Sequence, residues 1–231
     1  DAGNIGGGGF MTLYMDGEAE FLDYRETAPT AAHRDMYLDD SGAVLPDASL
    51  TGHRAVGTPG TVAGLWAAHQ RHGSLPWASL VAPAVALARD GYATPAWLVT
   101  YIEDAQGRFD GVTNFRRYFG ALREGQRFRQ PELAATLERI AEQGRRGFYE
   151  GTVAELLVAE MARGGGLITT RDLADYEPRW RAPLMADWRG YQLVTAPLPS
   201  SGGFAIIQFL KMRDLRAPDF AGLAHNSPQC L

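Results

Sequence analysis

The side chains best suited to binding a ligand in this sequence are Arg25 and its neighbour Glu26. They follow an apolar-rich segment, residues 19–24, and a run of four glycines, Gly6–Gly9, precedes them. Glycine lets a backbone approach a ligand closely, and a guanidinium can hold an anion through two parallel hydrogen bonds. The pattern therefore predicts an anion-binding arginine. Spacing alone leaves one alternative open, a structural ion pair of Arg25 with Asp23 or Glu26.

Three other patterns lack partners that their chemistry requires. The glycine run has no lysine and Ser/Thr of a phosphate loop, so we expect it to let the chain pass close to substrate or to another strand. His69 and His72 are three residues apart, but no cysteine or carboxylate completes a metal site. Ser200-Ser201 does not match the nucleophile elbow Gly-x-Ser-x-Gly, and we interpret it as a turn that caps the next helix. We expect neither a metal nor a cofactor.

A β-hairpin is predicted to position Arg25. Residues 10–15 and 19–24 are apolar-rich, and Asp16-Gly17 between them suits a type I′ turn, which needs positive φ at both central residues. We expect the returning strand to end at Arg25, since Pro29 prevents regular continuation.

The middle of the chain predicts helices. One is expected to be capped by Thr58, with Pro59 at its first position, and to end at Gly73. Residues 76–89 predict a second, in two pieces broken at Pro83, because proline cannot donate within a helix. The remaining predictions are a surface loop over 30–56, helices over 95–107 (Trp97, Tyr101 and Ile102 on one side), 131–143 and 152–163, and a helical turn from Thr170.

Near the end of the chain the period of the pattern changes. Residues 180–188 alternate, Arg189-Gly190 forms a turn, and residues 191–195 complete a predicted strand pair. A loop over 197–203 leads into an apolar helix around 204–212. Strands at both ends and helices between them predict an α+β fold. No repeat or linker is visible, so we expect a single domain over 1–231.

Composition excludes several classes of protein. The 231 residues are 45% hydrophobic and 21% charged, with a formal net charge of -5, as in ordinary globular proteins. The acidity argues against a nucleic-acid partner, so we interpret the Arg- and aromatic-rich residues 108–125 as a packed connector. No apolar run approaches the roughly 20 residues that span a bilayer. The only cysteine, Cys230, has no partner for an internal disulfide.

Segments along nearly the whole sequence resemble the gamma-glutamyltransferase family, in the order in which that family has them. The segments are Gly3-Asn4-Ile5-Gly6-Gly7-Gly8-Gly9-Phe10-Met11, Asp23-Tyr24-Arg25-Glu26-Thr27-Ala28-Pro29, residues 57–64, Leu75-Pro76-Trp77, Ala82-Pro83-Ala84, residues 165–169, Tyr176, Arg189-Gly190-Tyr191 and residues 199–203. The resemblance implies an N-terminal-nucleophile (Ntn) hydrolase with an αββα-type sandwich, of which this chain is an N-terminal portion of the large subunit.

The resemblance also implies a chemistry. In the family the precursor cuts itself, and the new N-terminal threonine of the small subunit attacks a gamma-glutamyl amide, its α-amino group of pKa about 8 acting as base. Thr169-Thr170 is followed by Arg171 and resembles a large-subunit helix start instead. The resemblance therefore implies no catalytic residue in this chain, which alone is expected to be inactive. It assigns Arg25, with Glu26, to binding gamma-glutamyl compounds such as glutathione.

Both ends of the sequence are expected to be cut, because Asp1 is not an initiator methionine and the C-terminal residues resemble a helix start. The resemblance suggests a periplasmic or secreted parent. Two alternatives remain open. One is a cephalosporin-acylase-like Ntn amidohydrolase, which turnover of glutathione against glutaryl-cephalosporin would distinguish. The other is a non-catalytic binding fragment that keeps the arginine.

Overall fold

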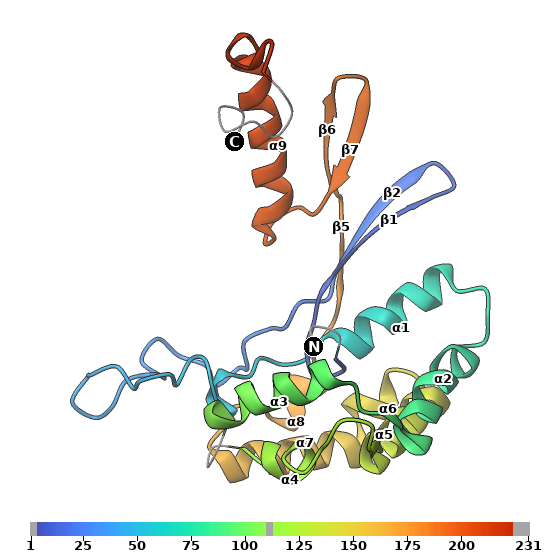
Figure 1. The fold of residues 1–231 in the computed structure, drawn as a ribbon, viewed down its shortest axis with the longest axis vertical. Coiled ribbons are helices and arrows are strands. Elements are labelled where there is room, and N and C mark those ends of the chain that lie inside the picture. Colours follow the sequence, from blue (N-terminus) through green and yellow to red (C-terminus); the bar gives the residue numbers. More distant parts are fainter. Residues whose placement is uncertain (1–3, 110–112, 224–231) are drawn as a thin grey trace. The chain divides into compact units, whose positions relative to one another are not determined.

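The computed structural model describes residues 4–109 and 113–223, which form helices and strands (Figure 1). The chain divides into two compact units, each built from two stretches of sequence. Unit 1 comprises Asp1–Gly9 and Tyr24–Pro178, and unit 2 comprises Phe10–Asp23 and Arg179–Leu231. The single domain expected over 1–231 stays a prediction.

Unit 2 begins with the predicted hairpin. Strands β1 (Phe10–Met15) and β2 (Glu18–Asp23) pair antiparallel. Asp16 and Gly17 have φ of 52° and 85°, as a type I′ turn requires, so the hairpin and its turn are confirmed. Strand β2 ends at Asp23, slightly before the predicted end at Arg25. Phe21 and Leu22 on β2 are fully buried.

The C-terminal part of unit 2 contains three strands and a long helix. Strand β5 (Arg179–Arg181) pairs with β2, whereas β6 (Leu184–Trp188) pairs with β7 (Tyr191–Thr195). The predicted strand over 180–188 is therefore two strands, and Pro183 lies at the break because it has no N–H to donate to a ladder. Helix α9 (Ser201–Leu215) lies beside β6 (Figure 1), and the 3₁₀ helix η2 (Ala217–Phe220) follows it.

Helix α9 is apolar but largely uncovered. Of its residues only Gly203 is buried. The large apolar side chains of α9 that are more than half exposed are Phe204, Ile206, Phe209, Met212 and Leu215. So many large apolar side chains exposed on one helix are unusual for a soluble monomer, so this helix is suited to contact another protein surface.

Unit 1 contains the helices of the middle of the chain. They are α1 (Thr61–His72), α2 (Trp77–Asp90), α3 (Ala96–Phe109), α4 (Phe115–Phe119), α5 (Pro131–Gln143), α6 (Arg146–Tyr149), α7 (Gly151–Gly164) and α8 (Thr170–Ala174), with the 3₁₀ helix η1 (His53–Ala55) and the short strands β3 (Tyr92–Ala93) and β4 (Arg127–Phe128). The hydrophobic core is formed by α1, α2, α5, α6, α7 and α8. Trp77 ties two of them together, since its Nε1 donates to the carbonyl of Ile140 at 2.8 Å.

Several helix boundaries agree with the sequence predictions. Helix α5 spans Pro131–Gln143 with Gly144 as its C-cap, and α1 ends at Gly73. Helix α7 ends before Gly165, whose φ of 72° is the left-handed conformation that glycine adopts at little cost. The short helical turn predicted from Thr170 is α8. Proline, glycine and the apolar stripe together located these helices.

Two predictions in unit 1 are wrong. Helix α1 begins at Thr61 with Gly60 as its N-cap, so Thr58 is not the cap and Pro59 is not its first residue. Helix α2 continues through Pro83 instead of breaking there. Helix α3 buries Ile102, but Trp97 and Tyr101 are more than half exposed. The predicted helix over 95–107 is confirmed as α3.

Candidate functional site around Arg25

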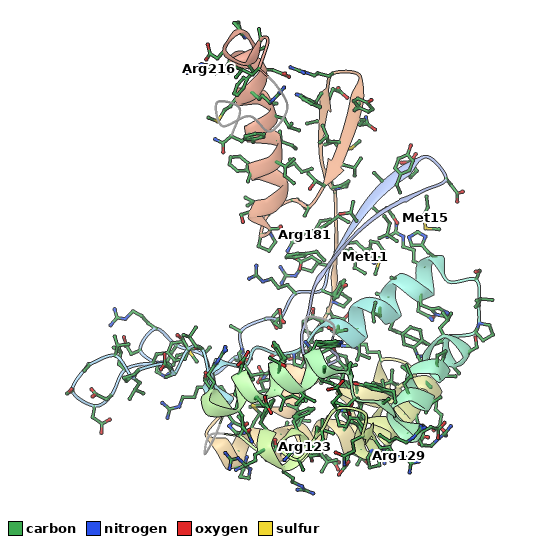
Figure 2. All side chains as sticks on the ribbon, in the orientation of Figure 1. Met11, Met15, Arg123, Arg129, Arg181 and Arg216 are labelled. Atoms are coloured by element: carbon green, nitrogen blue, oxygen red, sulfur yellow. The ribbon has the colours of Figure 1, made fainter. Side chains whose placement is uncertain are left out.

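Arg25 and Glu26 lie just after β2, where the chain leaves unit 2 for unit 1. The structure places both in an exposed position next to each other. Asp23, proposed above as an alternative partner for Arg25, accepts a hydrogen bond at 2.9 Å from Nε of Arg181, the residue labelled on strand β5 in Figure 2. An exposed arginine beside a buried chain segment is accessible to a small anionic ligand.

The backbone on both sides of Arg25 is held by hydrogen bonds. The carbonyl of Tyr24 accepts from Gly9 N at 3.2 Å, and Tyr24 N donates to the carbonyl of Gly9 at 3.0 Å. The carbonyl of Arg25 accepts from the hydroxyl of Tyr176 at 2.9 Å. Since peptide groups are planar, fixing the two that flank the Arg25 Cα restricts its φ and ψ. The direction of the Arg25 side chain is restricted with them.

Two glycines permit the close packing around this backbone. A Cβ on Gly8 would lie 2.5 Å from the Tyr24 carbonyl oxygen and 2.7 Å from Glu26 N. A Cβ on Gly60 would lie 2.1 Å from both the Tyr24 oxygen and the Tyr176 hydroxyl. Real Cβ atoms do not approach so closely, so only glycine fits. The glycine run was predicted to pass close to substrate or to another strand, and at Gly8 it packs against residues 24–26, which directly follow strand β2.

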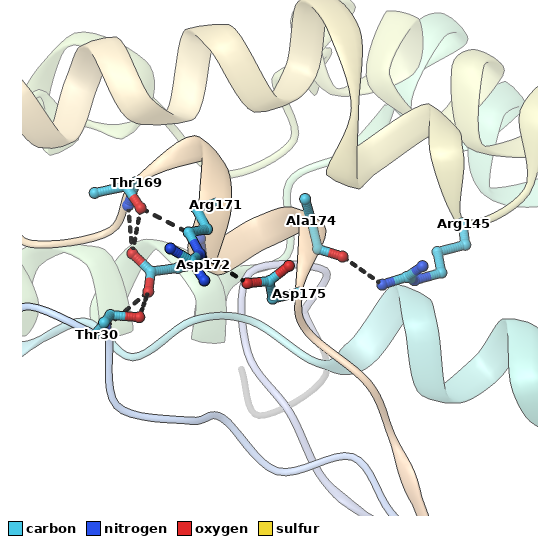
Figure 3. A network of polar contacts seen from close by, with 7 residues as sticks. All are labelled: Thr30, Arg145, Thr169, Arg171, Asp172, Ala174 and Asp175. Carbon is cyan, nitrogen blue, oxygen red and sulfur yellow. Dashed lines mark hydrogen bonds and ion pairs between the residues drawn. The ribbon is translucent and has the colours of Figure 1, made fainter.

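The segment that follows Arg25 is also tied down. Thr27 and Thr58 form an isolated antiparallel bridge, with N···O distances of 3.2 and 2.8 Å. This bridge explains why Thr58 does not cap α1, because its carbonyl accepts from Thr27 N, whereas the carbonyl of an N-cap residue accepts the first bond of the helix. Thr30 donates from both its N and its Oγ1 to Asp172 Oδ1, each at 2.7 Å (Figure 3).

Asp172 is a buried carboxylate that joins two segments. Its second oxygen accepts from Thr169 N and Thr169 Oγ1 at 2.8 and 2.6 Å, which forms a capping box at the start of α8 (Figure 3). Burial alone would raise the pKa of the Asp172 carboxyl, but the hydrogen bonds from Thr169 and Thr30 outweigh it and lower the pKa to about 2. Sequence reasoning missed Asp172, although the spacing Thr-x-x-Asp could have indicated it.

Tyr176, which bonds to Arg25, belongs to a buried aromatic stack. Its ring lies parallel to that of Tyr149, with centroids 5.8 Å apart. The Tyr149 hydroxyl donates to the carbonyl of Pro59 at 2.8 Å, and burial raises the pKa of this hydroxyl above its ordinary value. Arg145 lies over the Tyr149 ring and donates to the carbonyl of Tyr176. Tyr176 is thus fixed by its ring, its backbone and its hydroxyl.

The other candidate residues have structural contacts. His69 Nε2 lies 2.8 Å from the carbonyl oxygen of Leu75. Within residues 4–109 and 113–223 no three His, Cys, Asp or Glu side chains gather as metal ligands. The Ser200 hydroxyl accepts from Gly202 N at 3.4 Å and caps α9, as predicted. In the same ranges, every helix is too short or too polar to cross a bilayer. Arg25 remains the candidate on which the site depends.

Comparison with solved structures defines the class of fold. The structure matches a gamma-glutamyltranspeptidase from Pseudomonas nitroreducens complexed with L-DON, with a TM-score of 0.95 and 53% identity, over 98% of this chain and 68% of that chain. This is the Ntn-hydrolase fold, so the predicted α+β class is confirmed. A cephalosporin acylase from Bacillus halodurans is less similar, with a TM-score of 0.72 and 28% identity over 84% of this chain and 38% of that one.

The family follows from the sequence as a whole. The family model for gamma-glutamyltranspeptidase matches residues 1–231, and the chain belongs to this family. A glutathione hydrolase proenzyme from Pseudomonas aeruginosa is 56% identical over 227 residues, which is 98% of this chain. The chain spans 41% of the length of that relative. It is similar to the N-terminal part of a larger protein.

Proposed function

We propose that this chain is the N-terminal part of the large subunit of a gamma-glutamyl hydrolase and transferase that acts on glutathione and related gamma-glutamyl compounds. The observation that supports this most strongly is Arg25, which is exposed while both peptide groups that flank it are hydrogen-bonded. A gamma-glutamyl substrate carries an α-carboxylate far from its scissile amide. A guanidinium can hold that carboxylate with two parallel hydrogen bonds, and Glu26 lies beside it to help bind the same substrate.

The reaction needs residues that we assign to a second subunit. We propose that self-cleavage of the precursor creates an N-terminal threonine there, whose hydroxyl attacks the gamma-glutamyl amide. Its α-amino group takes the hydroxyl proton, the amine leaves, and a gamma-glutamyl ester remains. Water or the amino group of an amino acid or peptide then accepts the gamma-glutamyl group. The exposed apolar side chains of α9 offer a surface for such a subunit.

The role of Arg25 can be tested in the full-length protein. Arg25→Lys keeps the charge but loses the paired hydrogen bonds, and losing part of a charge-assisted contact in a desolvated site costs about 2–5 kcal/mol. If the contact is equally strong in ground and transition states, KM for a gamma-glutamyl substrate rises more than kcat falls. Arg25→Gln should have at least as large an effect, because it also removes the charge.

The matched control is Arg34→Lys, since Arg34 is an exposed arginine whose Nε lies 2.9 Å from its neighbour Asp35. It should leave KM unchanged. A structural ion pair of Arg25 predicts instead a lower thermal midpoint with normal KM, and that result in both Arg25 variants would end the carboxylate-binding assignment. Turnover of gamma-glutamyl-p-nitroanilide by the 231-residue chain alone, above a denatured control, would contradict the assignment of the nucleophile to another subunit. Faster turnover of glutaryl-cephalosporin than of glutathione would favour the acylase alternative.

A further inference from the structure

We infer that Tyr176 is a positioning residue for substrate binding, which acts by fixing the backbone of Arg25. This inference rests on the proposed function, because it assumes that Arg25 holds the substrate carboxylate. Tyr176 is buried, so we place its effect on the Arg25 backbone rather than on a ligand. Its hydroxyl donates to the carbonyl oxygen of Arg25 at 2.9 Å across 151 positions of sequence.

The backbone of Arg25 is hydrogen-bonded on both sides of its Cα. The peptide group before its Cα is held by Gly9, which donates to the Tyr24 carbonyl, and the peptide group after it is held by Tyr176. An arginine side chain has several rotatable bonds, and a small error in the direction of its Cα–Cβ bond grows toward the guanidinium. Binding of the carboxylate tolerates little such error, since the two parallel hydrogen bonds of a guanidinium require a fixed geometry. Releasing one of the two peptide groups should therefore weaken substrate binding.

Tyr176 is itself held in place by several contacts. The residue is 4% exposed, and its ring is stacked on that of Tyr149. Its own carbonyl accepts a hydrogen bond from Arg145. The hydroxyl faces Gly60, where a Cβ would lie 2.1 Å from it, so the site leaves no room for a side chain there. Because its ring, backbone and hydroxyl are all in contact with other residues, Tyr176 is suited to restrict the position of the Arg25 carbonyl.

The segment that begins at Arg25 is also anchored at its other end, at Thr30. Thr30 is bonded to Asp172, and Asp172 and Tyr176 lie on and just after helix α8. The segment from Arg25 to Thr30 is thus anchored at both ends to one short stretch of chain, residues 172–176. This arrangement fixes an exposed loop by buried contacts and leaves its outward side chains accessible to ligand.

The test compares two phenylalanine variants of the full-length protein. Tyr176→Phe removes the hydroxyl that bonds to Arg25 and keeps the ring. Tyr149→Phe is the matched control, because it removes a buried hydroxyl from the same stack that donates to the carbonyl of Pro59 and accepts from Ala63 N, not one that bonds to Arg25. One hydrogen bond of this kind corresponds to roughly 3- to 10-fold in an equilibrium constant. We expect Tyr176→Phe to raise KM for gamma-glutamyl-p-nitroanilide by roughly 3- to 10-fold with a smaller fall in kcat. Tyr149→Phe should lower the thermal midpoint without raising KM.

A double-mutant cycle with Arg25→Lys completes the test. If Tyr176 acts through Arg25, adding Tyr176→Phe to Arg25→Lys raises KM by less than it does in the wild type. The inference is overturned if Arg25→Lys raises KM but Tyr176→Phe does not, or if Tyr149→Phe raises KM equally. An unchanged KM in Arg25→Lys overturns the proposed function instead, and the positioning role with it.

Discussion

Replacing Asp172 by asparagine should lower the free energy of unfolding by an amount that depends on pH. In the wild type the carboxylate accepts four hydrogen bonds, two from Thr30 and two from Thr169. The asparagine side chain is isosteric with aspartate, but one acceptor oxygen becomes an NH₂ group. Whichever way the amide is turned, that group faces a backbone N–H that cannot rotate away, from Thr30 or from Thr169. The variant therefore loses both the charge and part of the network.

The size of the effect follows from the pKa of Asp172. It falls from an ordinary value of 3.8 to about 2 in the folded protein, and one pKa unit corresponds to about 1.4 kcal/mol. The charged carboxylate thus contributes about 2 kcal/mol to the free energy of unfolding. Because the folded pKa is the lower one, this contribution is complete above about pH 5 and is lost as the pH falls toward 2. Roughly half of it, about 1 kcal/mol, is gone at pH 3.

The measurement is the difference in free energy of unfolding between wild type and Asp172→Asn, from urea titrations of the full-length protein between pH 3 and 7. Other carboxylates titrate in both proteins, so they largely cancel in this difference. We expect a difference of at least about 2 kcal/mol at pH 7, since the lost hydrogen bonds add to the lost charge, and we expect it to be about 1 kcal/mol smaller at pH 3. Asp175→Asn is the control, because its ion pair with Arg171 on the same helix is exposed and should contribute less than about 1 kcal/mol (Figure 3).

A difference that stays constant with pH would refute the reasoning, because it would mean that the charge of Asp172 contributes nothing. A control variant that loses as much stability as Asp172→Asn would refute it as well. In that case the loss would reflect general weakening of α8 rather than the buried network.

Two further predictions concern α9 and α2. The isolated 231-residue chain should self-associate and bind a hydrophobic dye, because α9 exposes large apolar side chains. Phe209→Gln should reduce the dye binding. A monodisperse monomer that binds no dye would contradict the prediction. Pro83→Ala should raise the free energy of unfolding of the full-length protein by about 1–2 kcal/mol. The alanine N–H restores a hydrogen bond within α2, and this gain outweighs the greater conformational freedom of the unfolded chain. A lower free energy of unfolding in urea titrations would show that α2 needs the proline.

Local signals in the sequence predicted much of the fold. Asp16-Gly17 located the hairpin because its backbone requirement is met by two residues alone. Gly144 and Gly165 located helix ends for the same reason. The predicted break at Pro83 was wrong, because the packing of α2 against α5 can offset the free-energy cost of the one hydrogen bond that a proline cannot donate. Local signals cannot weigh that tertiary contribution.

Thr58 shows a second limit. Its type and its position before Pro59 suit a helix cap, yet the distant Thr27 recruits its backbone into a bridge. The surroundings of Arg25 were beyond sequence reasoning for a similar reason. Tyr176 and Asp172 lie about 150 positions away, and nothing local marks them as its supports. Arg25 itself was proposed from the sequence, because it follows a predicted strand end and a glycine run precedes the hairpin.

The pairing of β2 with β5 has a consequence for how the chain folds. Phe21 lies opposite Arg181, and residues 24–178 of unit 1 separate the two strands. At about 5–20 residues per second, the ribosome needs roughly 10 to 30 s to make the intervening chain. A two-stranded hairpin is marginal alone, so β1 and β2 must wait that long for their third strand with Phe21 and Leu22 uncovered. The contiguous helices of unit 1 can pack during this interval, and the sheet of β1, β2 and β5 closes after them.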